Sequence, residues 1–537
     1  LQKPFEKMHD ITKPYSIASN ESTEDNTYLS YNKVIGTSLD EKLYLAFQIL
    51  DYALLSAPGA PITKALLEAG IGKDISGSYD SSTYQPIFSI VAKNANEEQK
   101  AEFVKVIEDT LKGIVENGMD KKALEAGINY HEFRYREADF GGYPKGLMYG
   151  LQIFDSWLYD ETKPFIHVEA LDTFAFLKEQ ISTGYFEKLI QTYLLDNQHG
   201  ALVTIVPEPG RTARLDEELK AKLQAYKESL SREEIDKLVA DTKHLQEYQE
   251  EPSSQEDLEK IPMLTREDIS REIAPIYNEE MKIAEIPTVF HEIETNGIGY
   301  LDLMFDLSDV PEKDLPMVGL LQAVLGIIDT EHYEYGELFN EINRHTGGIG
   351  TSLELYPDVT KVREKEFRAT FEIKAKALYG QIPFAIRMMK EILTASKLDD
   401  EKRLKEILSM TKTRLQDRFL SAGHSAAALR AMSYKSPISK FKDTTNGIEY
   451  YQNIREMEEH FDEKKEEIIS GLKSLAELLF RKGNVMISYT AAREGLAVLE
   501  EEIGSLKEAL YSERTPESRC VLHCEKKNEG FKTSSKV

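Results

Sequence analysis

The spacing of histidine and glutamate decides whether this chain can do zinc chemistry, and its eleven histidines are the first candidates. A hydrolytic zinc site places two histidines one helical turn apart beside a glutamate, so that the metal activates a water and the glutamate accepts its proton. Neither H-E-x-x-H nor the inverted H-x-x-E-H occurs in the sequence. We therefore predict no catalytic residue and no metal ligand in this chain, and the substrate-binding residues stay unknown. Each of the three nearest approaches lacks the second histidine: His131-Glu132, His291-Glu292 and Glu459-His460.

The two cysteines, Cys520 and Cys524, flank His523 and could bind a soft metal. Their C-x-x-x-C spacing has no second cysteine pair to complete a site, so we interpret them as free thiols. So few cysteines exclude a disulfide framework and favour a reducing compartment, such as the cytoplasm or an organelle matrix.

Two glycine-rich segments, 141–142 and 347–350, are the candidates for a phosphate-binding loop. Neither has the lysine of a P-loop or the G-x-G-x-x-G spacing after a strand. Both fit glycines that end helices. His424 lies near Ser421 and Ser425, but nothing in the sequence groups them with the acid that a nucleophilic triad needs.

Acidic residues dominate the charge of the chain. Its 93 Asp and Glu against 66 Lys and Arg give a net charge of −27 over 537 residues. Because such a chain repels phosphate backbones, we predict no nucleic-acid partner. Hydrophobic residues make up 41% of the sequence, which is enough for packed cores. No run of about 18 apolar residues is present, so no membrane span is predicted.

Hydrophobic periodicity predicts the elements that must position any site. In the first part of the chain, strands are expected at 27–35, 74–82, 85–92 and 201–206. Helices are expected at 40–55, 62–68, 96–118 and 120–138, with more helix to residue 194. Asp40 and Asn96 are the expected caps of two of these helices.

The same order of elements recurs at an offset of about 280 residues, which indicates a duplication. FSIVAK at 88–93 corresponds to FEIKAK at 371–376. Further matches pair Phe103 with Phe384, Leu124 with Leu404, and Arg134 with Arg414. The predicted fold class is α+β, with two homologous repeat domains that each have a mostly antiparallel sheet packed with helices.

A charged linker, 211–274, separates the two expected domains, 25–210 and 275–512. An irregular segment, 1–24, precedes them, and a further linker, 513–537, follows them. The break at 229–231 and the bordering prolines predict a helical hairpin of two antiparallel helices, acting either as a hinge or as a plain spacer. Its apolar stripe is too narrow for a domain core: Leu215, Leu219, Leu223, Leu230, Ile235, Leu238 and Leu245.

Four segments carry a resemblance to a known family. They are LLSAPGAPITKALLEAGIGKDI at 54–75, FGGYPKGL at 140–147, the hairpin sequence at 230–269 and KNEGFKTSSKV at 527–537. With the duplicated order of elements, they make the chain resemble the insulinase/pitrilysin superfamily of zinc metallopeptidases, in its presequence-protease branch. The resemblance covers essentially the whole chain, and the hairpin is its most specific part.

The resemblance implies the central fragment of a clamshell enzyme whose four related domains enclose unstructured peptides in a chamber. The two repeats resemble its second and third domains. The zinc motif, the catalytic glutamate and a substrate-holding Tyr–Arg pair belong to the first and fourth domains, which are missing here. The resemblance thus implies zinc in the full-length enzyme and none bound to this chain.

The expected function is that of a non-catalytic central portion of a zinc metalloendopeptidase that degrades unstructured peptides, such as targeting peptides. Its partners would be those peptides and the missing first and fourth domains of the same protein. The alternative is a zinc-free pseudo-peptidase subunit that serves as a peptide-binding or assembly scaffold. A third interpretation is a repeat scaffold that binds partners through the hairpin. A first residue other than methionine and an end at an expected domain junction favour a fragment.

Overall fold

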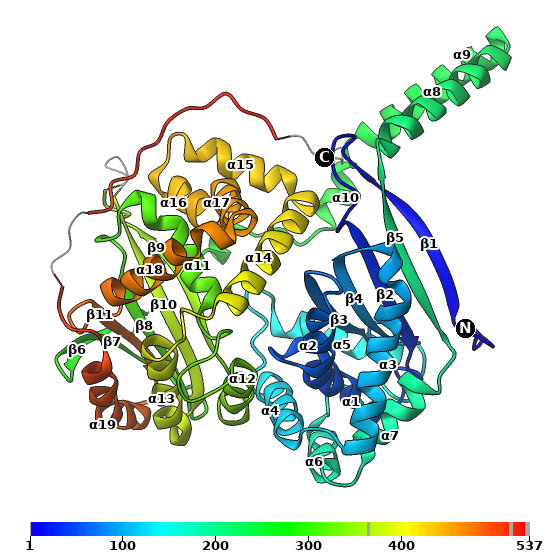
Figure 1. Cartoon of the computed structure of the whole chain (residues 1–537). Helices are drawn as coiled ribbons and strands as arrows, with labels where there is room; N and C mark the ends of the chain where they lie inside the picture. Colours follow the sequence, from blue (N-terminus) through cyan, green and yellow to red (C-terminus); the bar gives the residue numbers. More distant parts are fainter. Residues whose placement is uncertain (1, 274, 362–365, 515–518, 532–537) are drawn as a thin grey trace.

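The computed structural model describes residues 2–273, 275–361, 366–514 and 519–531. Two sheets, each with its own buried hydrophobic core, form two α+β domains that lie side by side (Figure 1). The predicted fold class is therefore confirmed. Of the predicted linker 513–537, residues 515–518 and 532–537 lie outside the described residues.

The first sheet has the strand order β1-β5-β2-β4-β3. β1 runs parallel to β5, and the other neighbouring strands are antiparallel. Leu29 and Tyr31 of β2 point into the core, as strict alternation predicts. The strands are β1 (His9–Ile17), β2 (Thr27–Val34), β3 (Asp74–Asp80), β4 (Ile87–Ala95) and β5 (Gly200–Pro209).

The prediction that residues 1–24 are irregular is wrong for His9–Ile17, which form β1. Most of β1 is exposed and carries Lys13 and Pro14, so its sequence lacks the alternation of a half-buried strand. Its partner in the structure is β5, nearly 200 residues further on, with Ile11 opposite Val203. Without that alternation, the local sequence does not mark these residues as a strand.

Local sequence signals do account for the helices of the first domain. The Asp40 carboxylate accepts a hydrogen bond from Leu43 N at 3.0 Å, and the predicted cap Asn96 forms a capping box with Gln99. Gly118, at φ 88°, ends the following helix. The helices are α1 (Glu41–Asp51), continued by a π-helical turn (Tyr52–Ser56), α2 (Pro61–Glu68), α3 (Lys100–Asn117), α4 (Lys121–Glu137), α5 (Lys145–Trp157), α6 (Leu171–Gln180) and α7 (Tyr185–Leu189).

The second sheet repeats the first, with the order β6-β7-β11-β8-β10-β9. β7 is parallel to β11 as β1 is to β5, and β8, β10 and β9 follow as β2, β4 and β3 do. β6 is an additional edge strand. The strands are β6 (Glu279–Ile283), β7 (Ile286–Glu292), β8 (Ile298–Asp306), β9 (Ile349–Pro357), β10 (Phe367–Leu378) and β11 (Val485–Ala491).

Helices cover the second sheet and build a separate helical layer beside it (Figure 1). On β8, Leu301, Leu303 and Phe305 enter the core, while Asp302 lies on the opposite face. The helices are α11 (Leu315–Val324), α12 (Tyr335–His345), α13 (Ile382–Thr394), α14 (Glu401–Ser421), α15 (Gly423–Ser433), α16 (Pro437–Asn446), α17 (Ile448–Glu459), α18 (Phe461–Leu479) and α19 (Arg493–Ala509).

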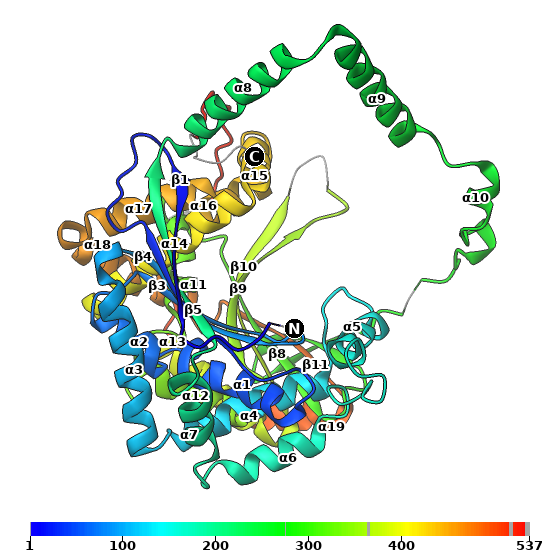
Figure 2. The ribbon, with the colours of Figure 1, turned by 90° about the vertical axis from the view of Figure 1, so that its right-hand side faces the viewer.

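The linker forms α8 (Arg211–Ser229), α9 (Arg232–Glu250) and the short α10 (Gln255–Glu259), with the break where it is predicted. Figure 2 shows α8 and α9 diverging from the bend at Leu230 instead of lying side by side. The apolar stripe stays in solvent, with Leu219 and Leu245 each 53% exposed. A stripe this narrow buries too little surface to hold two charged helices together. The hinge role stays a prediction.

No helix in the described part of the chain is both long and apolar enough to cross a bilayer.

Candidate functional site

The junction between the two domains is built on α4 and α12, which lie next to each other (Figure 1). Two close backbone approaches require glycine there. A Cβ on Gly336 would lie 2.9 Å from the Pro58 carbonyl oxygen, and a Cβ on Gly347 would lie 2.2 Å from the Phe133 ring. Pro58 belongs to the SAPGAP turn, so this turn serves as a contact between domains.

Polar contacts cross the same junction. Asn129 Nδ2 donates to the Asn343 carbonyl at 2.6 Å. Arg344 pairs with Glu125 at 2.7 Å, and Tyr300 Oη donates to Glu137 at 3.1 Å. These bonds join groups that are more than 160 residues apart, and each has a fixed geometry. The two domains therefore have a specific relative position.

Replacing Gly347 by alanine is expected to weaken the junction without unfolding either domain. The new methyl group would overlap the Phe133 ring, which must turn away and lose its packing, at a cost of about 1–3 kcal/mol. Limited proteolysis and small-angle scattering should report looser domains. Gly350→Ala is the control, because a Cβ there meets no atom within 4 Å. Identical scattering of the two variants would contradict the expectation.

A cavity of about 510 Å³ lies within this junction. One wall comes from the first domain, around the SAPGAP turn, α2 and the start of β3, and the other from α12 and α14 of the second domain. Its apolar lining includes Leu55, Ile75, Ile327, Phe339 and Met410. Two carboxylates, Asp74 and Glu406, line it beside six cationic side chains: Lys64, Lys73, Lys402, Arg403, Lys405 and Arg414.

Some of these cations are held by neighbours. Arg403 donates to the Ile327 carbonyl at 3.0 Å and to Glu406 at 2.9 Å, and its guanidinium lies 3.9 Å from the centre of the Tyr335 ring. Arg414 pairs with the buried Asp74 at 3.3 Å. The sequence match of Arg414 to Arg134 did not indicate this role, because the contact joins residues from different domains.

The structure places His131, the nearest approach to a zinc motif, beside a different cavity of about 320 Å³ in the first domain. Burial, followed by the charge of Arg134, lowers the pKa of His131 to about 4. Its neighbour Glu132 pairs with Arg136 and with Lys178. Neither residue therefore meets a second metal ligand.

His167 faces the same cavity of the first domain. Burial lowers its pKa to about 4. The neutral ring donates from Nε2 to the Ser38 carbonyl at 2.8 Å and stacks on Tyr44 at 3.8 Å. His167 and His131 are thus neutral imidazoles that support packing and hydrogen bonding at neutral pH.

The other candidate residues are separated by the fold. His291 contacts Asn278 at 2.8 Å and Ser488 at 3.1 Å, and His523 contacts Glu312 at 2.7 Å. Cys520 and Cys524 are free thiols. Among the residues that the structure describes, no three His, Cys, Asp or Glu side chains form a group that could hold a metal ion. The residues present do not fit the zinc that the resemblance implies for the full-length enzyme.

Comparisons with known proteins agree on one family. The family model described as "Peptidase M16 inactive domain" matches residues 2–130, and a model of the region associated with subfamily C of the same peptidases matches 205–457. Protein HypA of Clostridium perfringens is 38% identical over 536 residues, which is 100% of this chain and 55% of that protein. The chain belongs to the insulinase superfamily of M16 peptidases and is presequence-protease-like.

A second relative of this M16 chain is Presequence protease 1, chloroplastic/mitochondrial, of Arabidopsis thaliana. It is 28% identical over 517 residues, which cover 95% of this chain and 47% of that protein. The crystal structure of pitrilysin is similar at 12% identity and a TM-score of 0.39, over 90% of this chain and 47% of that one. The M16 chain thus spans about half the length of the curated relatives that it matches.

Proposed function

We propose that this M16 chain is the non-catalytic central portion of a zinc metalloendopeptidase that degrades unstructured peptides inside a closed chamber. The observation that carries the proposal is the extent of the matches. They cover 95% and 100% of this chain but only 47% and 55% of the relatives, one of which is named a presequence protease. The first part of the chain matches the domain described as inactive.

In this proposal the zinc and its glutamate base lie in domains outside this chain, and zinc would activate the attacking water there. The residues of this chain build part of the chamber wall and fix its shape through the α4–α12 junction. A net charge of −27 would attract basic peptides such as targeting sequences. The reducing compartment expected from two free thiols stays part of the proposal.

The purified chain is expected to hold no stoichiometric zinc and to cleave no peptide, because its ligand candidates are separated or paired. Elemental analysis and incubation with an unstructured basic peptide measure both properties. The whole reading frame that contains this chain, expressed in parallel, should bind zinc and cleave the peptide until a chelator is added. Tightly bound zinc with chelator-sensitive cleavage by this chain alone would contradict the proposal.

The same experiment decides between this proposal and a zinc-free pseudo-peptidase subunit. If the whole frame binds the peptide tightly without metal and never cleaves it, the subunit interpretation holds instead. Cleavage by the whole frame and none by the chain supports the central-portion proposal.

A further inference from the structure

We infer that the junction cavity binds a phosphate-bearing organic anion that contacts both domains at once. The inference is independent of the peptidase proposal, because it concerns only the cavity of about 510 Å³ between α2 and α14. Cavities of this size are typical of small-molecule sites with an apolar floor and a few converging polar groups.

Charge is the first observation that favours an anion. Six lysine or arginine side chains and only two carboxylates line the cavity, in a chain whose net charge is −27. An excess of cations concentrated between low-dielectric walls attracts anions strongly, whatever the net charge of the whole protein. The acidic composition makes this concentration of positive charge a local property of the junction.

Two of the six cationic side chains that line the cavity are not paired with a carboxylate in the described part of the chain. Lys64 of α2 and Lys402 of α14 form no ion pair with any residue that the structure describes, although other lysines around them are paired. They come from opposite domains and line one cavity. A phosphate group between them would satisfy both ammonium groups and tie the domains together.

Two arginines that line the cavity carry further donors for a ligand with several acceptor oxygens. Arg403 is fixed by Glu406, the Ile327 carbonyl and the Tyr335 ring. Arg414 has a side chain 60% exposed and shares Asp74 with Lys93, so its guanidinium has donors to spare. Forked guanidinium donors and lysine point charges together suit phosphate oxygens.

The apolar part of the lining indicates that the anion has an organic body. Leu55, Ile75, Ile327, Phe339 and Met410 line the same cavity as the cations. An inorganic ion alone would leave that surface in water, whereas an attached ring or chain would cover it. A ligand that bridges both walls also stabilises the folded arrangement of the domains in proportion to its concentration.

Isothermal titration of the intact chain with pyrophosphate, AMP, ATP and citrate, at low and high NaCl, tests the inference. We expect binding of one organic phosphate per chain, tighter than pyrophosphate and weakened by salt. Exchanging both free lysines, Lys64→Glu with Lys402→Glu, should weaken binding about tenfold or more. The control, Lys220→Glu with Lys222→Glu on the exposed helix α8, makes the same change in charge away from the cavity.

Each other outcome overturns part or all of the inference. Absence of saturable binding, or equal affinity of the cavity variant and the α8 control, removes the site. Citrate binding as tightly as ATP removes the preference for phosphate, and binding of pyrophosphate alone removes the organic body. Circular dichroism of both variants checks that they are folded, so that a loss of binding is not a result of unfolding.

Discussion

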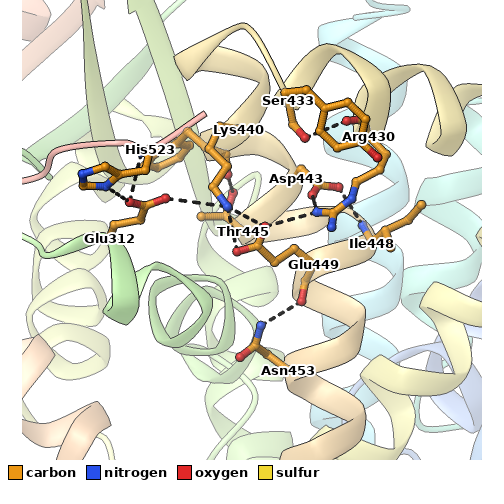
Figure 3. Close-up of polar contacts among 12 residues, drawn as sticks. Glu312, Arg430, Ser433, Lys440, Asp443, Thr445, Ile448, Glu449, Asn453 and His523 are labelled. Atoms are coloured by element: carbon orange, nitrogen blue, oxygen red, sulfur yellow. Dashed lines mark hydrogen bonds and ion pairs between the residues drawn. The ribbon is translucent and has the colours of Figure 1, made fainter. Parts of the chain in front are cut away.

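Replacing Arg430 by methionine is expected to destabilise the second domain by about 3–5 kcal/mol. Arg430 of α15 has a side chain only 7% exposed and contacts the fully buried Asp443 at 2.5 Å. It also contacts Glu449 at 3.2 Å (Figure 3) and Glu529 at 2.6 Å. Methionine fills much of the same space but leaves the Asp443 carboxylate buried without its cation, and an unpaired buried charge is costly.

The effect can be measured by hydrogen exchange in α15, α16 and α17. The fluorescence of the single tryptophan, Trp157, reports on the first domain and should change little. Arg232→Met is the matched control, because its partner Asp236 and the arginine itself are exposed, and its loss should cost less than about 1 kcal/mol. Adding Asp443→Asn to Arg430→Met should restore part of the stability. Equal protection in Arg430→Met and Arg232→Met would refute the expectation.

The second domain is also expected to lose stability as the pH rises from 6 to 8, because of a carboxyl pair formed by the half-buried Asp302 and the buried Glu372. Burial, then the nearby Glu372 carboxyl, raises the pKa of Asp302 to about 8. Glu372 is fully buried and accepts hydrogen bonds from Thr370 at 2.6 Å and Tyr356 at 2.7 Å, with Lys374 at 2.9 Å. These donors favour the charged form of Glu372 and leave the proton on Asp302.

The direction follows from the two protonation states. An unfolded chain releases the Asp302 proton near pH 4, whereas the folded protein keeps it to about pH 8. The folded state therefore binds the extra proton between these values, and stability falls with rising pH by up to about 1.4 kcal/mol per unit. Above pH 8 both states are ionised and this loss is complete.

Asp302→Asn should remove this pH dependence, because the amide needs no proton to remain neutral beside Glu372. Hydrogen exchange in β8 and β10 at pH 6 and pH 8 should then be nearly the same for the variant and should differ for the unmodified chain. Asp306→Asn makes the same change on the same strand, where the partner is Arg368 at 3.4 Å, and should keep the wild-type slope. An unchanged pH dependence in Asp302→Asn would refute the interpretation that Asp302 keeps a proton beside the charged Glu372.

Several elements were predictable because their signals are local. Asp40, Asn96 and Gly118 mark helix ends through contacts within three or four residues. The alternation of Leu301, Leu303 and Phe305 identifies β8 for the same reason. β1, β6, β7 and β9 were not predicted, because they lie at or near sheet edges and depend on partners elsewhere in the chain or on short exposed pairings.

The linker has helices that the sequence predicts and an arrangement of these helices that it does not. Its two helices and their break follow from Ser231 and Glu234, which form a capping box at the start of α9. The relative direction of α8 and α9 depends on whether their narrow stripe of leucine side chains packs against another surface. Figure 2 shows an open arch, which no pattern within the segment encodes.

The duplicated α+β order and the resemblance to insulinase-superfamily peptidases could be read from the sequence, because caps and alternation are local patterns and the same patterns recur along the chain. Which side chains meet became visible in the folded chain alone. Lys64 and Lys402 line one cavity, Arg414 reaches Asp74, and Asp302 shares a site with Glu372. These groups come from separate strands, helices or domains, so their interaction depends on how the chain packs and on the water that packing removes.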